Sequence, residues 1–184
     1  ARIGGPADAL LFARSADELA DAVETFWRLD LPFVLLGSGS NVLVSDRGVR
    51  GVVIINRARM IKFDSQAEPP TVTAESGATL NDLAQRAARL GLSGMEWAAT
   101  VPGTLGGAVY GNAGAFDGDM AGNLHSIELL ERGRGRQTWP VEKLEYGYRT
   151  SRLKREHPPA VILKAHLTLQ RGDPRAIQAK MAQF

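Results

Sequence analysis

The chain has 184 residues, of which 44% are hydrophobic and 23% are charged, with a formal net charge of +2 and no cysteine. This composition is typical of one globular domain or of two small lobes with a common core, and it argues against a disordered or fibrous protein. The near-neutral charge argues against a dedicated nucleic-acid binder, and the lack of cysteine excludes disulfides and thiolate metal sites. No apolar run approaches the length of a membrane span, so we expect a cytoplasmic protein.

The first part of the chain predicts a small α/β lobe. In residues 15–29, Ser15 as an N-cap, Glu18 three positions later and periodic apolar residues predict an amphipathic helix with a capping box. Three segments rich in apolar and β-branched residues are expected to form strands after this helix. They are PFVLLG at 32–37, VLVSD at 42–46 and GVRGVVIIN at 48–56.

A second lobe is predicted to be α+β and mostly strands. The polar, proline-rich segment DSQAEPPT at 64–71 is interpreted as the connection between the lobes. Thr79 is expected to cap a helix over 80–92 that Gly91 ends. The expected strands are TVTAESGA at 71–78, SIELLER at 126–132, QTWPVEK at 137–143 and AVILKAHLTLQ at 160–170. We therefore assign residues 1–63 to the first lobe, 64–170 to the second, and 171–184 to a helix that Asp173 caps and that leads towards a further domain.

The first glycine-rich segment, Gly37-Ser38-Gly39-Ser40-Asn41, comes directly after a predicted buried strand. Glycines permit positive φ angles, and successive amides can then converge on an anion, while Ser and Asn add uncharged donors. The segment is not a dinucleotide fingerprint of the Rossmann type, because no helix pattern opens directly behind it, and it lacks the Gly-Lys-Ser/Thr ending of a P-loop. Taken alone, such a loop is more often an ordinary turn than a phosphate site.

The second glycine-rich segment is VPGTLGGAVYGNAGAFDG at 101–118. We interpret it as a long loop, because packed helices and strands rarely contain so much glycine. A pyrophosphate needs exposed amides, and a flat aromatic ligand needs a backbone free of side chains. A tight crossing of two packed segments would explain one such loop, but two in one chain favour an extended cofactor that carries phosphates.

Three motifs resemble a known family in both order and spacing. LLGSGSNVLVSD at 35–46, MEWAATVPGTLGGAVYGNAGAFDG at 95–118 and LEYGYRTSRLK at 144–154 are similar to the MurB family of UDP-N-acetylenolpyruvoylglucosamine reductases. IGGPA at 3–7 also resembles the opening turn of that family, and the resemblance covers essentially the whole chain. It implies an α+β, two-lobed FAD-binding domain of the vanillyl-alcohol-oxidase (PCMH) type.

The resemblance implies that FAD binds non-covalently between the lobes. The residues implied for the pyrophosphate in the first lobe are Gly37, Ser38, Gly39, Ser40 and Asn41. Those implied for the diphosphate and the flavin in the second lobe are Gly103, Thr104, Gly106, Gly107, Asn112, Gly114 and Ala115.

The resemblance also implies that Arg149 is the catalytic residue of an NADPH-dependent reduction of UDP-N-acetylglucosamine enolpyruvate to UDP-N-acetylmuramate, a peptidoglycan precursor. Hydride addition to the enolpyruvyl double bond leaves negative charge on the adjacent carboxylate, and a guanidinium aimed at that charge stabilises the transition state. Thr150 stands where the family usually has Asp. The family's proton-donating serine and catalytic glutamate lie in a third, substrate-binding domain, so we expect this chain to bind FAD with little or no turnover.

Two alternatives stay open. The alternatives to a reductase are another flavin oxidase of the same fold, which the GYR motif at 147–149 disfavours, and a flavin-binding module without catalysis. No metal site is expected, because His125, His157 and His166 lack ligand spacing. No protein partner, nucleic acid or membrane is indicated.

Several other residues are expected to serve packing or solvent exposure rather than catalysis. Trp27 is expected to be a core residue. Trp97, just before the long loop, is expected to be buried, with a position beside the cofactor as the alternative. The basic residues Arg152, Lys154 and Arg155 remain weak candidates for contacts with the diphosphate of a UDP-sugar.

Overall fold

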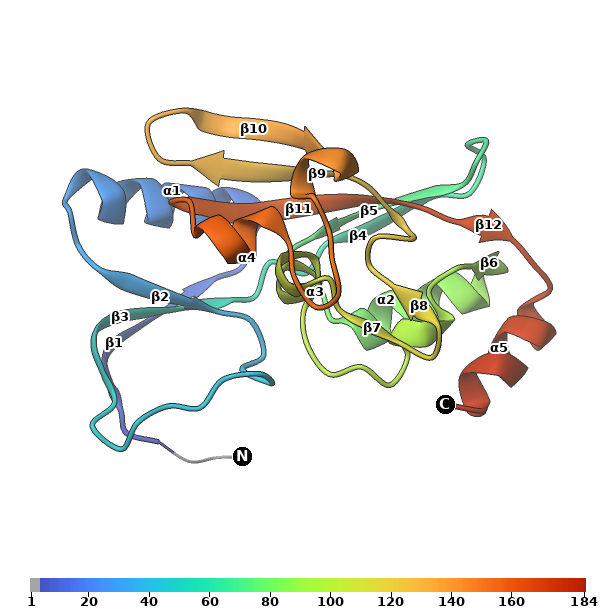
Figure 1. The fold of residues 1–184 in the computed structure, drawn as a ribbon, viewed down its shortest axis with the longest axis horizontal. Helices are drawn as coiled ribbons and strands as arrows, with labels where there is room; N and C mark the ends of the chain where they lie inside the picture. Colours follow the sequence, from blue (N-terminus) through green and yellow to red (C-terminus); the bar gives the residue numbers. More distant parts are fainter. Residues whose placement is uncertain (1–3) are drawn as a thin grey trace.

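The computed structural model describes residues 4–184, which form two lobes built on separate β-sheets (Figure 1). The first lobe contains β1 (Ala7–Ala13), α1 (Ala16–Arg28), β2 (Phe33–Leu36) and β3 (Val49–Asn56). Its three strands are parallel and lie in the order β1-β3-β2.

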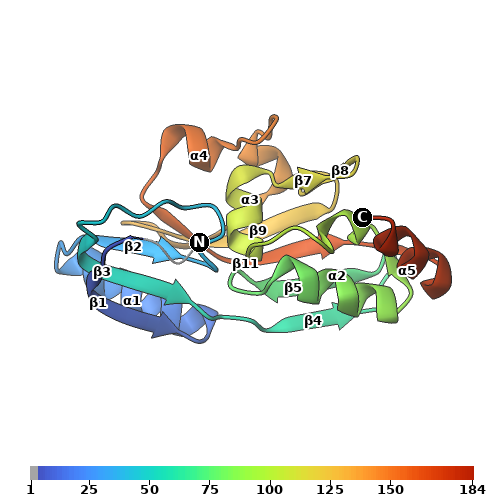
Figure 2. The same ribbon diagram turned by 90° about the horizontal axis from the view of Figure 1, so that it is seen from below.

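The second lobe is built on a five-stranded antiparallel sheet in the order β10-β9-β11-β5-β4. Its strands are β4 (Ile61–Asp64), β5 (Thr71–Glu75), β9 (Leu124–Glu131), β10 (Gly135–Pro140) and β11 (Ala160–Thr168). The helices α2 (Leu80–Arg89) and α3 (Leu105–Gly111) pack over this sheet (Figure 2). Thr79 caps α2 through its side chain, as predicted, and the helix ends just before Gly91, which has a φ of +68°.

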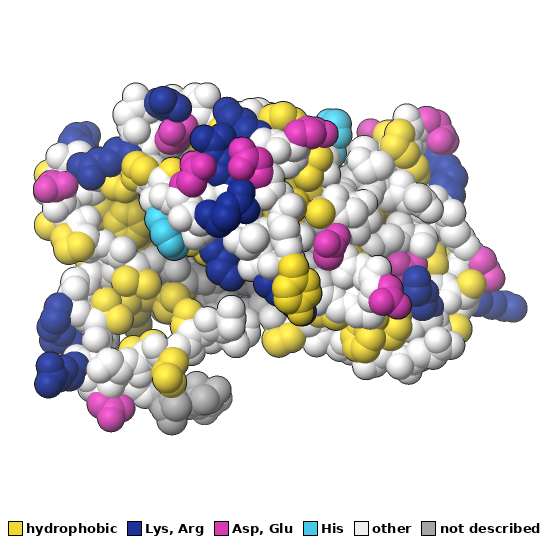
Figure 3. All heavy atoms as spheres, viewed as in Figure 1, with side chains coloured by type: hydrophobic (Ala, Val, Ile, Leu, Met, Phe, Trp, Pro, Cys, Tyr) yellow, Lys and Arg dark blue, Asp and Glu magenta, His cyan; other side chains and the backbone are white. Residues whose placement is uncertain are grey.

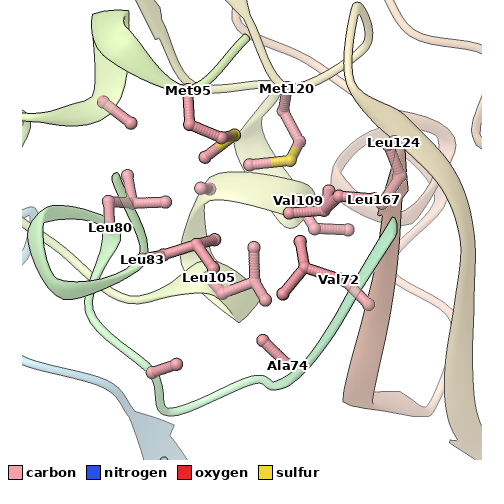
Figure 4. Packing of buried hydrophobic residues seen from close by; sticks show 14 of the residues in the cluster. Val72, Ala74, Leu80, Leu83, Met95, Leu105, Val109, Met120, Leu124 and Leu167 are labelled. Carbon is pink, nitrogen blue, oxygen red and sulfur yellow. The ribbon is translucent and has the colours of Figure 1, made fainter. Parts of the chain in front are cut away.

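The main hydrophobic core lies between this sheet and its helices (Figure 4). Its fully buried members include Val72, Leu80, Leu83, Met95, Leu105, Val109, Met120 and Leu167. Because Leu105 and Val109 of α3 are buried in this core, the opposite face of α3 is free to face the first lobe.

Helix α1 begins as its sequence predicts and packs between the lobes. Ser15 Oγ accepts a hydrogen bond from the Glu18 N–H at 3.1 Å, and the Glu18 carboxylate accepts from the Arg14 N–H at 2.7 Å. The carboxylate thus reaches one residue further back than in a standard capping box. Leu19 and Val23 are buried in a second core cluster that contains residues of β3, β9 and β11, so α1 joins the two sheets.

Eight further elements complete the described part of the chain. They are β6 (Leu92–Ser93), η1 (Glu96–Ala98), β7 (Gly114–Ala115), β8 (Gly118–Asp119), η2 (Val141–Leu144), α4 (Arg152–Glu156), β12 (Gln170–Arg171) and α5 (Pro174–Ala182). Asp173 caps α5 by accepting from the Arg175 N–H at 3.1 Å. Within residues 4–184, no helix combines the length and apolar character needed to cross a bilayer.

The boundary between the sheets differs from the predicted one. β4 pairs with β5 in the sheet of the second lobe, so this sheet already begins at Ile61 rather than at residue 64. The segment at 64–71 is the loop of the β4–β5 hairpin and not the connection between lobes. The physical reason is that Ile61 is buried in the main core, which draws its strand into the second lobe.

In the first lobe one strand prediction was wrong and one strand was missed. VLVSD at 42–46 is irregular, because the side chains of Val42 and Leu43 are 51% and 84% exposed and no strand in the described part of the chain pairs with them. β1 was not predicted, because the apolar run in ADALLFA does not alternate with a period of two.

The second glycine-rich segment is also more regular than predicted. Residues 105–111, interpreted as part of a long loop, form the helix α3. Burial of Leu105, Ala108 and Val109 in the core outweighs the low helix propensity of the glycines around them.

Candidate functional site

A cavity of about 970 Å³, here called the interlobe cavity, lies between the lobes. Figure 3 shows the surface hollowed in this region. The sequence-predicted residues that line it are Gly37, Ser38, Gly39, Ser40, Asn41, Gly103, Thr104, Gly106, Gly107 and Arg149. A second cavity, of about 570 Å³, lies beside α5 and contains none of the predicted residues. The fold therefore gathers both glycine-rich segments and the arginine on one cavity.

The two glycine-rich segments touch each other where they enter the interlobe cavity. A Cβ atom on Gly37 would clash with the Thr104 side chain, so only glycine permits this approach. Ser40 Oγ donates a hydrogen bond to the Pro102 carbonyl at 3.3 Å, across 62 positions of sequence. The loop after β2 is thereby held against the segment that begins α3.

The loop at residues 37–41 lies on the wall of the cavity, and its backbone amides are without acceptors in the described chain. Gly39 has a φ of +69°, which lets the loop turn tightly after β2. Backbone N–H groups that lack an acceptor at a cavity wall are favourable partners for an anion.

The glycines of α3 divide into two kinds. A Cβ on Gly106 would lie 2.9 Å from the Ser76 Cβ, so Gly106 allows close packing on the second lobe. A Cβ on Gly107 would lie 3.8 Å from its nearest neighbour, the Thr104 Oγ1, and a Cβ on Gly111 would have no neighbour within 4 Å. These two residues lie one helical turn apart on the wall of the cavity and form the glycine face of α3. Alanine would fit at both sites without a clash, so the absent side chains leave a smooth surface for a ligand.

Three predicted contact residues lie outside the lining of the interlobe cavity. Asn112 is buried, has a φ of +46° and ends α3. Its Nδ2 donates to the Gly147 carbonyl at 3.1 Å, and its Oδ1 accepts from the Ala121 N–H at 3.0 Å. Gly114 and Ala115 form β7, where a Cβ on Gly114 would clash with β8. The structure thus gives these three residues packing and hydrogen-bonding tasks beside the cavity.

Arg149 lies at the tip of a tight turn, here called the Arg149 turn (Gly147–Thr150). Gly147 and Thr150 exchange two backbone hydrogen bonds, of 3.1 and 3.2 Å, across its base. Arg149 has a φ of +55°, a left-handed conformation that usually favours glycine or asparagine. Such strain costs about 1–3 kcal/mol and is concentrated at functional sites. Thr150, which stands in place of the expected Asp, supports the turn through its backbone.

The basic residues after the turn have different environments. Arg152 is paired with Glu156 at 2.9 Å, and Arg155 is paired with Glu145 at 3.0 Å, so the charge of both is compensated within the chain. Lys154 lines the interlobe cavity and donates from Nζ to the Arg149 carbonyl at 2.9 Å. Of the three weak candidates, only Lys154 faces the cavity.

Four polar residues line the cavity without having been expected there. Asn56 Nδ2 donates to Ser76 Oγ at 2.8 Å, and both side chains are buried at the junction of the lobes. Tyr110 Oη lies 3.1 Å from His157 Nδ1 at the mouth of the cavity. Helical periodicity would have placed Tyr110 near Gly107, but α3 was not predicted; the other three carry no sequence signal.

The tryptophans differ from each other. Trp97 is 4% exposed, as expected of a core residue, and its indole N–H donates to Asn123 Oδ1 at 3.2 Å. Trp27 packs against the second core cluster but also lines the interlobe cavity.

Known proteins share this architecture. Residues 7–139 match the family described as FAD binding domain. The chain is 38% identical over 183 residues to the UDP-N-acetylenolpyruvoylglucosamine reductase of Lactobacillus gasseri, and 41% identical over 185 residues to that of Rubrobacter xylanophilus. These alignments cover 100% of this chain and 59% and 60% of the two relatives. The chain thus spans about 60% of the length of these curated relatives.

Solved structures give the same result. The crystal structure of MurB from Thermus caldophilus matches with a TM-score of 0.80 and 34% identity, over 98% of this chain and 62% of that one. A solvent-stable cholesterol oxidase has the same fold, with a TM-score of 0.70 at 17% identity, over 89% of this chain and 35% of that one. The resemblance inferred from the three motifs is confirmed, and so is the two-lobed α+β fold of PCMH-type flavin-binding domains.

Proposed function

The chain belongs to the FAD binding domain family, and we propose that it is the FAD-binding part of a UDP-N-acetylenolpyruvoylglucosamine reductase. One observation carries this proposal: two glycine-rich segments from different lobes meet on one cavity, together with Arg149. The relatives that share 38% and 41% of its residues are named for this activity.

The residues of the interlobe cavity suit a dinucleotide. We assign the pyrophosphate of FAD to the amides of residues 37–41, which lack acceptors within the described chain, and to Gly103 and Thr104. The isoalloxazine would rest on the glycine face of α3, where Gly107 and Gly111 leave room for a flat ring. When bound, FAD supplies hydride transfer from NADPH to the substrate.

Arg149 is the residue that we assign to catalysis. Reduction of an enolpyruvyl ether places negative charge next to its carboxylate, and the guanidinium of Arg149 would stabilise this charge more strongly in the transition state than in the ground state. Lys154, which holds the Arg149 carbonyl, adds a second positive charge to the same wall.

The proposed overall reaction balances as follows. UDP-N-acetylglucosamine enolpyruvate, NADPH and one proton give UDP-N-acetylmuramate and NADP⁺. This product feeds peptidoglycan synthesis in the cytoplasm, and thereby cell division and cell shape. The proton donor and a catalytic glutamate would come from a substrate-binding domain, so we expect residues 1–184 alone to bind FAD with little turnover.

Titration of the 184-residue chain with FAD tests the proposal. We expect uptake of FAD, seen as a change in the flavin absorption spectrum, and bleaching of the oxidised band by NADPH. Gly107→Val should weaken FAD binding by about tenfold or more, since tenfold corresponds to about 1.4 kcal/mol of lost contact. Ala176→Val, on the exposed side of α5, is the matched control and should bind FAD normally. A chain that takes up no flavin contradicts the proposal.

A further inference from the structure

The side chains on either side of the Arg149 turn reach back to α3. Tyr146 Oη donates a hydrogen bond to the Val109 carbonyl at 2.8 Å. Ser151 Oγ donates to the next carbonyl, that of Tyr110, at 2.7 Å. The last carbonyls of a helix have no intrahelical partner, so these hydroxyls satisfy two acceptors at the end of α3.

A third contact approaches the same turn from α3. Asn112, which directly follows the helix, donates from Nδ2 to the Gly147 carbonyl at 3.1 Å. The other side of the Asn112 amide accepts from the Ala121 N–H, which fixes the orientation of the group. Hydrogen bonds therefore tie three positions to α3 or to the residue that ends it: one before the Arg149 turn, one within the turn and one after it.

Burial protects the hydrogen bonds of Ser151 and Tyr146 from competition by water. Ser151 is fully buried, and its Oγ also accepts from the Lys154 N–H at 3.2 Å as the N-cap of α4. Burial raises the pKa of the Tyr146 hydroxyl, so it stays protonated and able to donate. The Arg149 side chain, by contrast, is exposed, so the backbone beneath it largely decides where it points.

We propose that Tyr146, Ser151 and Asn112 are positioning residues that fix the Arg149 guanidinium relative to the glycine face of α3. The same helix would then support the isoalloxazine and hold the arginine that acts beside it. This inference rests on the proposed function, because the glycine face is assigned there to the flavin. Catalytic groups need support of this kind, since small displacements of a charged group strongly reduce its effect on a reaction.

The midpoint potential of bound FAD provides the test, measured on the FAD-loaded chain. A cation held beside the ring favours the two-electron-reduced form, so Arg149→Ala should lower the potential. Tyr146→Phe and Ser151→Ala should lower it by part of that shift while leaving FAD affinity within about threefold of normal. Ser151→Thr, which retains the hydroxyl, should restore the potential. Ser126→Ala, at another buried serine, is the matched control and should not change it.

A second readout needs no flavin. Trypsin cleavage of the Arg149–Thr150 bond, followed by mass spectrometry, should be several-fold faster in Tyr146→Phe and Ser151→Ala and unchanged in Ser126→Ala. If Arg149→Ala lowers the potential and the Tyr146 and Ser151 variants do not, the positioning role is wrong. It is also wrong if Arg149→Ala leaves the potential unchanged. Failure of the unmodified chain to take up FAD would instead reject the proposed function, and the positioning role with it.

Discussion

The loop at residues 37–41 and the helix α3 both bring glycine to the interlobe cavity, but the glycines act differently. In the loop, glycine permits a tight turn and leaves amides without acceptors, and Gly37 also allows contact with Thr104. In α3, Gly106 packs against the second lobe, whereas Gly107 and Gly111 face open space. Glycine content alone therefore does not distinguish packing positions from open ones; the neighbours that a Cβ atom would meet at each position do.

Gly37→Ala should have the largest effect on the first segment. The added Cβ would overlap Thr104, and overpacking of this kind costs about 1–3 kcal/mol. We expect a lower melting temperature and weaker FAD binding, measured by thermal unfolding and by titration. Combining Gly37→Ala with Thr104→Ala removes the clashing atoms and should recover part of the lost stability. If the single variant is as stable as the unmodified chain, the two segments do not meet as described.

Gly106→Ala should destabilise the second segment by a smaller amount. Its Cβ would lie 2.9 Å from the Ser76 Cβ, and we expect a net loss of about 1 kcal/mol after the gain in helix propensity. Urea unfolding measures this loss. An increase in stability would show that α3 can move away from Ser76 without cost.

Gly107→Ala should change stability in the opposite direction. The site has room for a methyl group, so alanine should stabilise α3 by about 0.5–1 kcal/mol through helix propensity. The same methyl group would occupy the surface assigned to the flavin, so FAD binding should weaken. Urea unfolding without FAD and titration with FAD separate the two effects. Stabilisation with unchanged FAD affinity would remove the glycine face from the site.

The smallest effect concerns Glu96, which precedes the second segment. Burial raises the pKa of its carboxyl, but hydrogen bonds from Ser93 and from the backbone outweigh this and lower the pKa below 4.5. Because the pKa of Glu96 is lower in the folded state, its ionised carboxylate stabilises the fold at pH values above the pKa of the unfolded state. This stabilisation is lost as the pH falls through the pKa of the folded state. We expect Glu96→Gln to lower the melting temperature slightly at neutral pH, with the difference shrinking from about pH 6 to about pH 3. A difference that grows with acidity would contradict this assignment.

Local signals in the sequence predicted the fold where they were unambiguous. Ser15, Thr79 and Asp173 marked the starts of three helices, because N-caps act through neighbouring residues. α3 was missed because its stability comes from burial of Leu105 and Val109 in a core that only the complete fold creates. Residues 61–63 were assigned to the first lobe, whereas they belong to β4 of the second sheet, for the same reason.

The sequence also predicted part of the lining of the interlobe cavity, which is the candidate site. Glycine patterns identified both segments, since glycine marks unusual backbone or close approach. They did not distinguish Asn112, Gly114 and Ala115, which the structure places beside the cavity, from the residues that line it. Arg149 came only from the family resemblance, and Asn56, Ser76 and His157 reach the cavity through contacts between distant parts of the chain.

A structure of the chain with FAD bound would show whether the cofactor occupies the interlobe cavity. We expect pyrophosphate oxygens within hydrogen-bonding distance of the amides of residues 37–41, and the isoalloxazine resting on Gly107 and Gly111. FAD bound outside the interlobe cavity, or a dinucleotide whose phosphates avoid those amides, would contradict this assignment.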